Sequence, residues 1–141
     1  MKSRVLFLCT GNSCRSQMAE GLLRHLADGR FDVASAGTHP VGLNPRAVAI
    51  MREIGIDISQ QRSKPVDEIL SRDFDYVVTV CDHAKESCPA LPTTSKVLHW
   101  SFDDPAAARG TDDDQRATFR RVRDEIRTAV ERFIKIERPG G

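Results

Sequence analysis

Short apolar runs recur along the chain, separated by stretches in which apolar residues return with helical spacing. Four of these runs have the length of buried strands, namely Arg4–Leu8, Phe31–Ala34, Tyr76–Val80 and Lys96–Leu98. The run Tyr76–Val80 gives the clearest strand signal of the four.

Helical periodicity fills the stretches between and after these runs. The longest predicted helix spans roughly Asp112 to Ile136. Its apolar stripe consists of Phe119, Val122, Ile126, Val130 and Phe133. Two shorter predicted helices each have one apolar face, formed by Met18, Leu22, Leu23 and Leu26 in the first and by Val48, Met51 and Ile54 in the second. This alternation predicts an α/β fold in three layers, with a parallel sheet between helices.

Size and composition narrow the class of protein. A chain of 141 residues with 40% hydrophobic residues suits one domain, so we expect a single domain over residues 1–141, with a frayed tail at 136–141. The net charge of +1 gives no sign of a nucleic-acid or membrane partner. Because no signal peptide or spanning segment is apparent, we expect a cytoplasmic protein whose four cysteines rest as thiols. We expect a monomer because no unpaired hydrophobic stripe is left over.

The segment after the first predicted strand carries the strongest chemical signal. It reads Cys-Thr-Gly-Asn-Ser-Cys-Arg-Ser and leads into a helix expected to start near Ser13. Backbone N–H groups of such a loop can surround one oxyanion, and Arg15 can donate two parallel hydrogen bonds to it. The same positive field favours the thiolate of Cys9, since thiols in such settings have pKa values of roughly 3.5–7.5. We therefore expect Cys9 to be a nucleophile. The predicted oxyanion-binding residues are Thr10, Gly11, Asn12, Ser13, Cys14, Arg15 and Ser16.

A carboxylic acid is available further along the chain, in an Asp-Asp-Pro step. Attack on an oxyanion releases an oxygen that needs a proton, and Asp104 can supply it. Pro105 restricts the backbone of Asp104 and thus the direction of its side chain. Asp103 is the competing candidate, with capping of the turn as its alternative role.

Two further cysteines, Cys81 and Cys88, follow the third predicted strand, where they should lie on the same edge of the sheet as Cys9. Their spacing, even with His83 or Cys14 added, matches no common zinc site, so we expect no bound metal. A thiol relay is the better interpretation, with Cys81 and then Cys88 taking up a disulfide from Cys9. If 82–88 is helical, the two α-carbons are roughly 10.5 Å apart, too far for a disulfide. We therefore predict an order change over residues 82–95 on oxidation. Cys14 itself is better explained as a buried packing residue.

These motifs together resemble the thioredoxin-coupled arsenate reductases built on the low-molecular-weight tyrosine phosphatase scaffold. The resemblance covers nearly the whole chain, from the cysteine loop through Ser35-Ala36-Gly37, Asn44-Pro45-Arg46-Ala47 and Cys88-Pro89 to Phe102-Asp103-Asp104-Pro105. It implies a flavodoxin-like fold with a central four-stranded parallel sheet.

The resemblance also implies an activity and a reductant. Cys9 would attack arsenate held by the loop and Arg15, while Asp104 protonates the departing oxygen. Cys81 would then release arsenite by forming a disulfide with Cys9, and Cys88 would take over that disulfide. Thioredoxin, or another cellular thiol system, would supply electrons, so no bound cofactor is implied.

One feature departs from the resembled family. Some members hold a potassium ion through residues matching Asn12, Glu20 and Ser35 together with an acidic residue. Near the expected place of that acid this chain has Gln61-Arg62-Ser63-Lys64. We expect Lys64 to take the place of the cation and pair with Glu20, so that potassium has little effect.

Two other functions are compatible with parts of the pattern. A tyrosine phosphatase shares the loop and the acid, but usually has aromatic residues after the Asp-Pro step, where this chain has Ala106-Ala107-Ala108. A non-catalytic thiol sensor for arsenite or soft metals would need neither Arg15 nor Asp104. The reductase is therefore the favoured hypothesis, with weak phosphatase activity as a side reaction.

Overall fold

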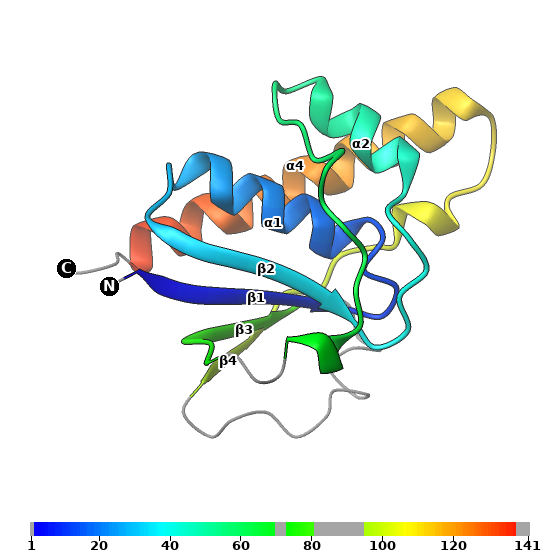
Figure 1. The fold of residues 1–141 in the computed structure, drawn as a ribbon. Helices are drawn as coiled ribbons and strands as arrows, with labels where there is room; N and C mark the ends of the chain where they lie inside the picture. Colours follow the sequence, from blue (N-terminus) through cyan, green and yellow to red (C-terminus); the bar gives the residue numbers. More distant parts are fainter. Residues whose placement is uncertain (1, 70–72, 81–94, 138–141) are drawn as a thin grey trace.

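The computed structural model describes residues 2–69, 73–80 and 95–137, and these form a twisted sheet with helices packed against it (Figure 1). The strands are β1 (Ser3–Cys9), β2 (Phe31–Gly37), β3 (Tyr76–Thr79) and β4 (Lys96–His99). They pair in parallel in the order β2-β1-β3-β4. The predicted α/β class and four-stranded parallel sheet are thus confirmed, and each strand lies where its apolar run indicated.

The described helices are α1 (Arg15–Leu26), α2 (Pro45–Arg52) and α4 (Asp112–Ile136), with short 3₁₀ helices η1 (Val66–Glu68) and η2 (Pro105–Ala107). Figure 1 shows α1 and α4 side by side over the same face of the sheet. The first helix begins at Arg15, so the expected start near Ser13 is wrong by two residues, which instead belong to the loop. Ile54 lies in the turn after α2 and not within it.

Burial explains why β1 tolerates no polar residue beyond its start. It is paired on both sides, and Val5 through Cys9 are all buried. At the far end of the sheet, Phe133 of α4 packs against Phe31, Tyr76 and Trp100, with ring centroids 5.2–6.0 Å apart. This cluster anchors the last turns of α4 on the sheet. Among the residues described, no helix is long and apolar enough to cross a membrane.

The chain remains anchored beyond the last turn of α4. The Glu137 carboxylate accepts hydrogen bonds from the Tyr76 hydroxyl (2.7 Å) and from the Lys96 ammonium (2.9 Å). The expectation of a frayed tail from residue 136 is therefore wrong for residues 136 and 137, because these contacts attach the end of α4 to β3 and β4. Residues 138–141 lie outside the described part.

Parallel pairing brings the carboxyl ends of the strands to one edge. Cys9 of β1 is in register with Gly37 of β2, and Thr79 of β3 is in register with His99 of β4. The cysteine loop, the segment after Gly37 and the segment after His99 consequently leave the sheet at the same edge. This is where a parallel α/β sheet places its ligand.

Candidate active site

The loop between β1 and α1 is built around Cys9 and Asn12. Cys9 is the last residue of β1 and is 3% exposed. Asn12 is fully buried and has φ of 45°, in the left-handed region that asparagine tolerates better than most residues. This turn lets the chain double back between the strand and the first turn of α1.

The carbonyl oxygens of the loop are all held by other parts of the protein. Each accepts one hydrogen bond: the carbonyl of Thr10 from His39 N (2.8 Å), that of Gly11 from Val41 N (3.0 Å), that of Asn12 from Gln17 Nε2 (3.0 Å), that of Ser13 from Asn44 N (3.1 Å) and that of Cys14 from Met18 N (2.8 Å). The backbone N–H groups of residues 11–15, by contrast, have no acceptor within the described segments. Peptide groups fixed in this way present donors and no acceptors to the interior of the loop, which suits an anion.

Arg15 connects the loop with the predicted acid. Its guanidinium donates to the Phe102 carbonyl (3.0 Å) and lies 3.8 Å from the Asp104 carboxylate. Two of the residues predicted from sequence, Arg15 and Asp104, therefore lie together, and Arg15 follows directly on the loop that begins after Cys9. The Arg15 side chain is mostly buried, while that of Asp104 is 46% exposed and accessible from solvent.

The two neighbouring aspartates have different partners. Asp104 caps η2 by accepting a hydrogen bond from Ala106 N (3.0 Å), whereas Asp103 forms an ion pair with Arg121 of α4 (3.0 Å). The turn-capping role considered for Asp103 is thus filled by Asp104. The cap and the following Pro105 fix the backbone that carries the Asp104 carboxyl group.

Behind the loop lies a chain of buried polar groups. Asn12 Nδ2 donates to both Ser16 Oγ (2.8 Å) and Ser35 Oγ (2.9 Å), and Ser35 donates to Glu20 (2.5 Å). The Glu20 carboxylate forms an ion pair with the Arg24 guanidinium, with 2.7 Å between Glu20 Oε2 and Arg24 Nη2.

The predicted pairing of Lys64 with Glu20 is therefore wrong. Lys64 Nζ donates instead to the Arg62 carbonyl (3.2 Å), and its backbone N–H binds Asn12 Oδ1 (3.0 Å). Burial lowers the pKa of Lys64, and nearby Glu20 partly opposes that shift. Arg24, four residues after Glu20 on the same helix, reaches the carboxylate more directly.

Cys14 is a buried packing residue, as the sequence indicated. It is 4% exposed, and burial raises the pKa of its thiol to about 11, so it stays protonated at neutral pH. Its sulfur lies 3.6 Å from Ser13 Oγ. This inert thiol contrasts with the role expected of Cys9.

The predicted relay cysteines, Cys81 and Cys88, lie outside the described residues, as does His83. The predicted order change over 82–95 falls almost entirely in the same part of the chain. In the segments that are described, no three His, Cys, Asp or Glu side chains gather as a metal site would require.

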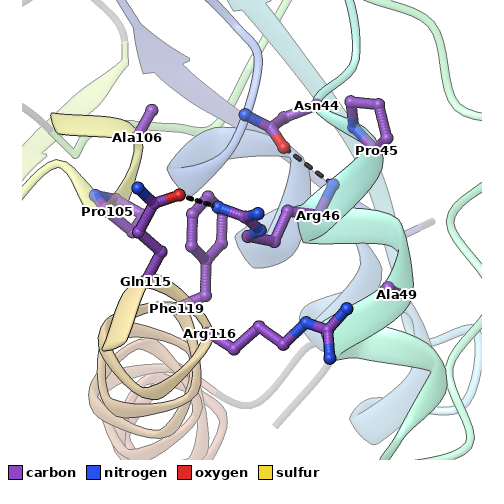
Figure 2. Close-up of a pocket in the computed structure, with 9 residues that line it drawn as sticks. All are labelled: Asn44, Pro45, Arg46, Ala49, Pro105, Ala106, Gln115, Arg116 and Phe119. Carbon is purple, nitrogen blue, oxygen red and sulfur yellow. Dashed lines mark hydrogen bonds between the residues drawn. The ribbon is translucent and has the colours of Figure 1, made fainter. Parts of the chain in front are cut away.

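A hollow of about 420 Å³ lies beside the acid, between α2, η2 and the start of α4 (Figure 2). Arg46 crosses it, with its backbone N–H donating to Asn44 Oδ1 (2.8 Å) and its guanidinium to Gln115 Oε1. Asn44 also holds the Ser13 carbonyl, and Pro105 forms part of the wall. These residues thus connect the cysteine loop to the segment of Asp104. The Asn-Pro-Arg-Ala motif formed part of the resemblance without a predicted role, and neither Gln17 nor Gln115 was among the predicted site residues.

The model of one family, the low molecular weight phosphotyrosine protein phosphatases, matches residues 4–138. The chain belongs to this family. Within it, close relatives are proteins named arsenate reductase. One from Halalkalibacterium halodurans is 53% identical over 134 residues, covering 95% of this chain and 96% of that protein. Another from Bacillus subtilis is 48% identical over 136 residues, covering 96% and 98%.

Solved structures of the family agree with the observed architecture. An arsenate reductase in the phosphate binding state is 36% identical, with a TM-score of 0.79 over 96% of this chain and 98% of that one. The low molecular weight phosphatase of T. tengcongensis is 25% identical, with a TM-score of 0.81 over 96% and 100%. A thioredoxin-dependent arsenate reductase of Corynebacterium glutamicum is 29% identical and has a TM-score of 0.75, covering 96% of this chain and 61% of that one. The predicted family and fold are confirmed.

Proposed function

We propose that this protein reduces arsenate to arsenite, with Cys9 as the nucleophile. The observation that supports a sulfur attack on an oxyanion is the loop after Cys9. Its carbonyls at residues 10–14 accept hydrogen bonds from elsewhere in the protein, while the N–H groups of residues 11–15 have no acceptor within the described segments. The choice of arsenate is supported by the relatives named arsenate reductase, which match the chain over almost its entire length.

In the first step the Cys9 thiolate attacks arsenic and displaces one oxygen as water. The loop N–H groups and Arg15 neutralise the negative charge of the oxyanion, which lowers the barrier to attack by an anionic sulfur. Asp104 donates the proton that the departing oxygen needs. For this role the Arg15 guanidinium would exchange its hydrogen bond to the Phe102 carbonyl for bonds to the oxyanion, and it already lies 3.8 Å from the Asp104 carboxylate.

In the second step Cys81 attacks the sulfur of Cys9. The electron pair of the Cys9–arsenic bond passes to arsenic, so arsenic(V) becomes arsenic(III) and leaves as arsenite. The two cysteines lose those two electrons and form a disulfide. Cys88 then attacks Cys81, which frees Cys9 as a thiolate and moves the disulfide to Cys81–Cys88.

The dithiol that returns two electrons to the Cys81–Cys88 disulfide is proposed to be thioredoxin. The support is that a structural neighbour from Corynebacterium glutamicum is a thioredoxin-dependent arsenate reductase. Arsenate and this reductant are then the partners that the reaction needs, and no bound cofactor is required. We propose that the protein acts as a monomer in the cytoplasm, where reduced thioredoxin is supplied.

The test is a single turnover without external reductant. Fully reduced protein is mixed with arsenate, arsenite is measured, and disulfides are mapped by mass spectrometry. We expect about one arsenite per chain and a Cys81–Cys88 disulfide. A Cys88→Ser variant should also release arsenite once but stop with Cys9 joined to Cys81, whereas Cys9→Ser should release none. Intact thiols and no arsenite in the wild-type protein would contradict the proposal.

Phosphotyrosine hydrolysis is the second candidate, and the name of the family supports it directly. The same loop, arginine and acid would form and hydrolyse a thiophosphate at Cys9 without the other cysteines. Against it stands the alanine run after Pro105, which offers no aromatic surface to an aryl group. Rapid turnover of an aryl phosphate combined with no arsenite release would favour this function.

A further inference from the structure

Arg24 is a half-exposed residue of α1 that joins three segments of the fold. Its guanidinium donates to the Glu20 carboxylate (2.7 Å), to the Val33 carbonyl of β2 (2.8 Å) and to Gln61 Oε1 (3.2 Å). The helix, the edge strand and the segment that wraps behind the cysteine loop therefore meet at one cation. None of these contacts was expected from the sequence.

The carboxylate that Arg24 binds is itself buried, with only 6% of the Glu20 side chain exposed. Glu20 accepts the Ser35 hydroxyl at 2.5 Å, and Ser35 accepts the Asn12 amide at 2.9 Å. Asn12 is the buried left-handed residue that shapes the anion loop. Consecutive hydrogen bonds thus lead from Arg24 through Glu20 and Ser35 to the loop.

The charges around Glu20 show why this contact matters. Lys64 and Arg62 come from the segment behind the loop, but Lys64 Nζ is bound to the Arg62 carbonyl, and Arg62 pairs with Glu68 at 2.5 Å. Within the described segments, Arg24 is the cation that makes an ion pair with Glu20. A buried carboxylate without a partner is costly and leaves a negative charge. Here that charge would lie behind a loop that must hold an oxyanion and a thiolate.

We propose that Arg24 is a positioning residue for catalysis, because it neutralises the negative charge of Glu20 behind the anion loop. It thereby also holds Asn12 in place through Glu20 and Ser35. The inference rests on the proposed role of this loop as the anion site. It assigns a role in catalysis to a side chain that touches neither the substrate nor Cys9.

The test measures the reactivity of Cys9 and anion binding by the loop, without the use of arsenate. Alkylation of Cys9 by iodoacetamide is followed against pH by peptide mass spectrometry, with and without inorganic phosphate as a protecting anion. Arg15 and Asp104, the charged groups that act on the neighbouring Cys14, are unchanged in every variant. In Arg24→Gln we expect the midpoint of Cys9 alkylation to rise by about one pH unit and phosphate to protect about tenfold more weakly, as for an uncompensated nearby carboxylate.

Two further variants separate charge from structure. Arg24→Lys restores a cation, and Glu20→Gln with Arg24→Gln removes both charges while keeping an acceptor for Ser35. Both should return the Cys9 midpoint and phosphate protection close to the wild-type values. Arg132→Gln, the same change at an exposed position of α4, should leave both unaltered.

A wild-type midpoint in Arg24→Gln would overturn the inference, as would a double variant that remains as impaired as the single one. If Arg24→Gln fails to fold, the double variant and Arg24→Lys still test the inference, because a shifted midpoint of Cys9 alkylation in either variant contradicts charge neutralisation by Arg24. Arsenate takes no part in these measurements. Failure of arsenate reduction would therefore refute the proposed function and leave the result on Arg24 intact. Likewise, an unchanged Cys9 midpoint in Arg24→Gln would refute the role of Arg24 and leave the proposed function intact.

Discussion

Gly37, the last residue of β2, lies directly under the anion loop. A β-carbon built on it would come within 2.6 Å of the Thr10 carbonyl oxygen, 2.9 Å of the Asn12 β-carbon and 3.0 Å of the Asn12 nitrogen. The first contact is 0.8 Å shorter than the 3.4 Å at which ordinary contact begins. All three atoms belong to the loop itself, and two of them are backbone atoms that no rotamer change can move. In Gly37→Ala the loop must therefore shift as a unit.

The expected cost follows from that overlap. Added methyl groups in a closely packed interior destabilise by about 1–3 kcal/mol, or roughly 4–12 °C in melting temperature for a domain near this size. A displacement of the loop N–H groups approaching an ångström should also lower kcat/KM for arsenate about 100-fold. Thermal unfolding by circular dichroism and steady-state arsenite release measure the two effects.

Gly29→Ala is the matched control. Gly29 has φ of 78°, and a β-carbon on it would meet nothing within 4 Å. The substitution should therefore cost stability through backbone strain, about 1 kcal/mol, but keep the kcat/KM of the wild type. A Gly37→Ala protein with the melting temperature and kcat/KM of the wild type would refute the argument from loop geometry.

Three other predictions concern the acid, the single tyrosine and cations. Asp104→Asn should lower the rate of arsenite release by about 10²–10⁴-fold. Asp103→Asn removes only the contact with Arg121 and should change the rate little. Equal effects of the two substitutions in single-turnover assays would exclude Asp104 as the acid. The hydrogen bond to Glu137 raises the pKa of Tyr76 to about 12 from 10.0, so the folded state holds this proton more tightly and stability should fall as pH rises between these values. Tyr76 is the only tyrosine, so its phenolate absorbance should show the raised midpoint, and Tyr76→Phe should lack this part of the alkaline loss. Potassium should leave the melting temperature unchanged, because Arg24 already neutralises Glu20; a clear potassium-dependent rise would contradict this.

Features that depend on local chain order could be predicted from the sequence. The strands follow from apolar runs, and α4 spans Asp112–Ile136 as its 3.6-residue periodicity indicated. The cysteine loop was also predictable, because its residues are contiguous and their chemistry is specific. Cys14 was correctly assigned to packing because an apolar thiol next to a helix start is usually buried.

Features that depend on which side chains meet across the fold could not be predicted. Glu20 pairs with Arg24 and not with Lys64, because the direction of Lys64 is set by the backbone of residues 61–64, which is itself bound to Asn12 and Gly37. Glu137 is held by Tyr76 and Lys96, which are 61 and 41 residues earlier, so local composition could only suggest a free end. The sequence by itself determined the cysteine loop and the parallel sheet, since these follow from contiguous residues and from the periodicity of the apolar positions. Only the tertiary structure decided which groups hold the loop carbonyls and neutralise Glu20, because those contacts join residues far apart in the chain.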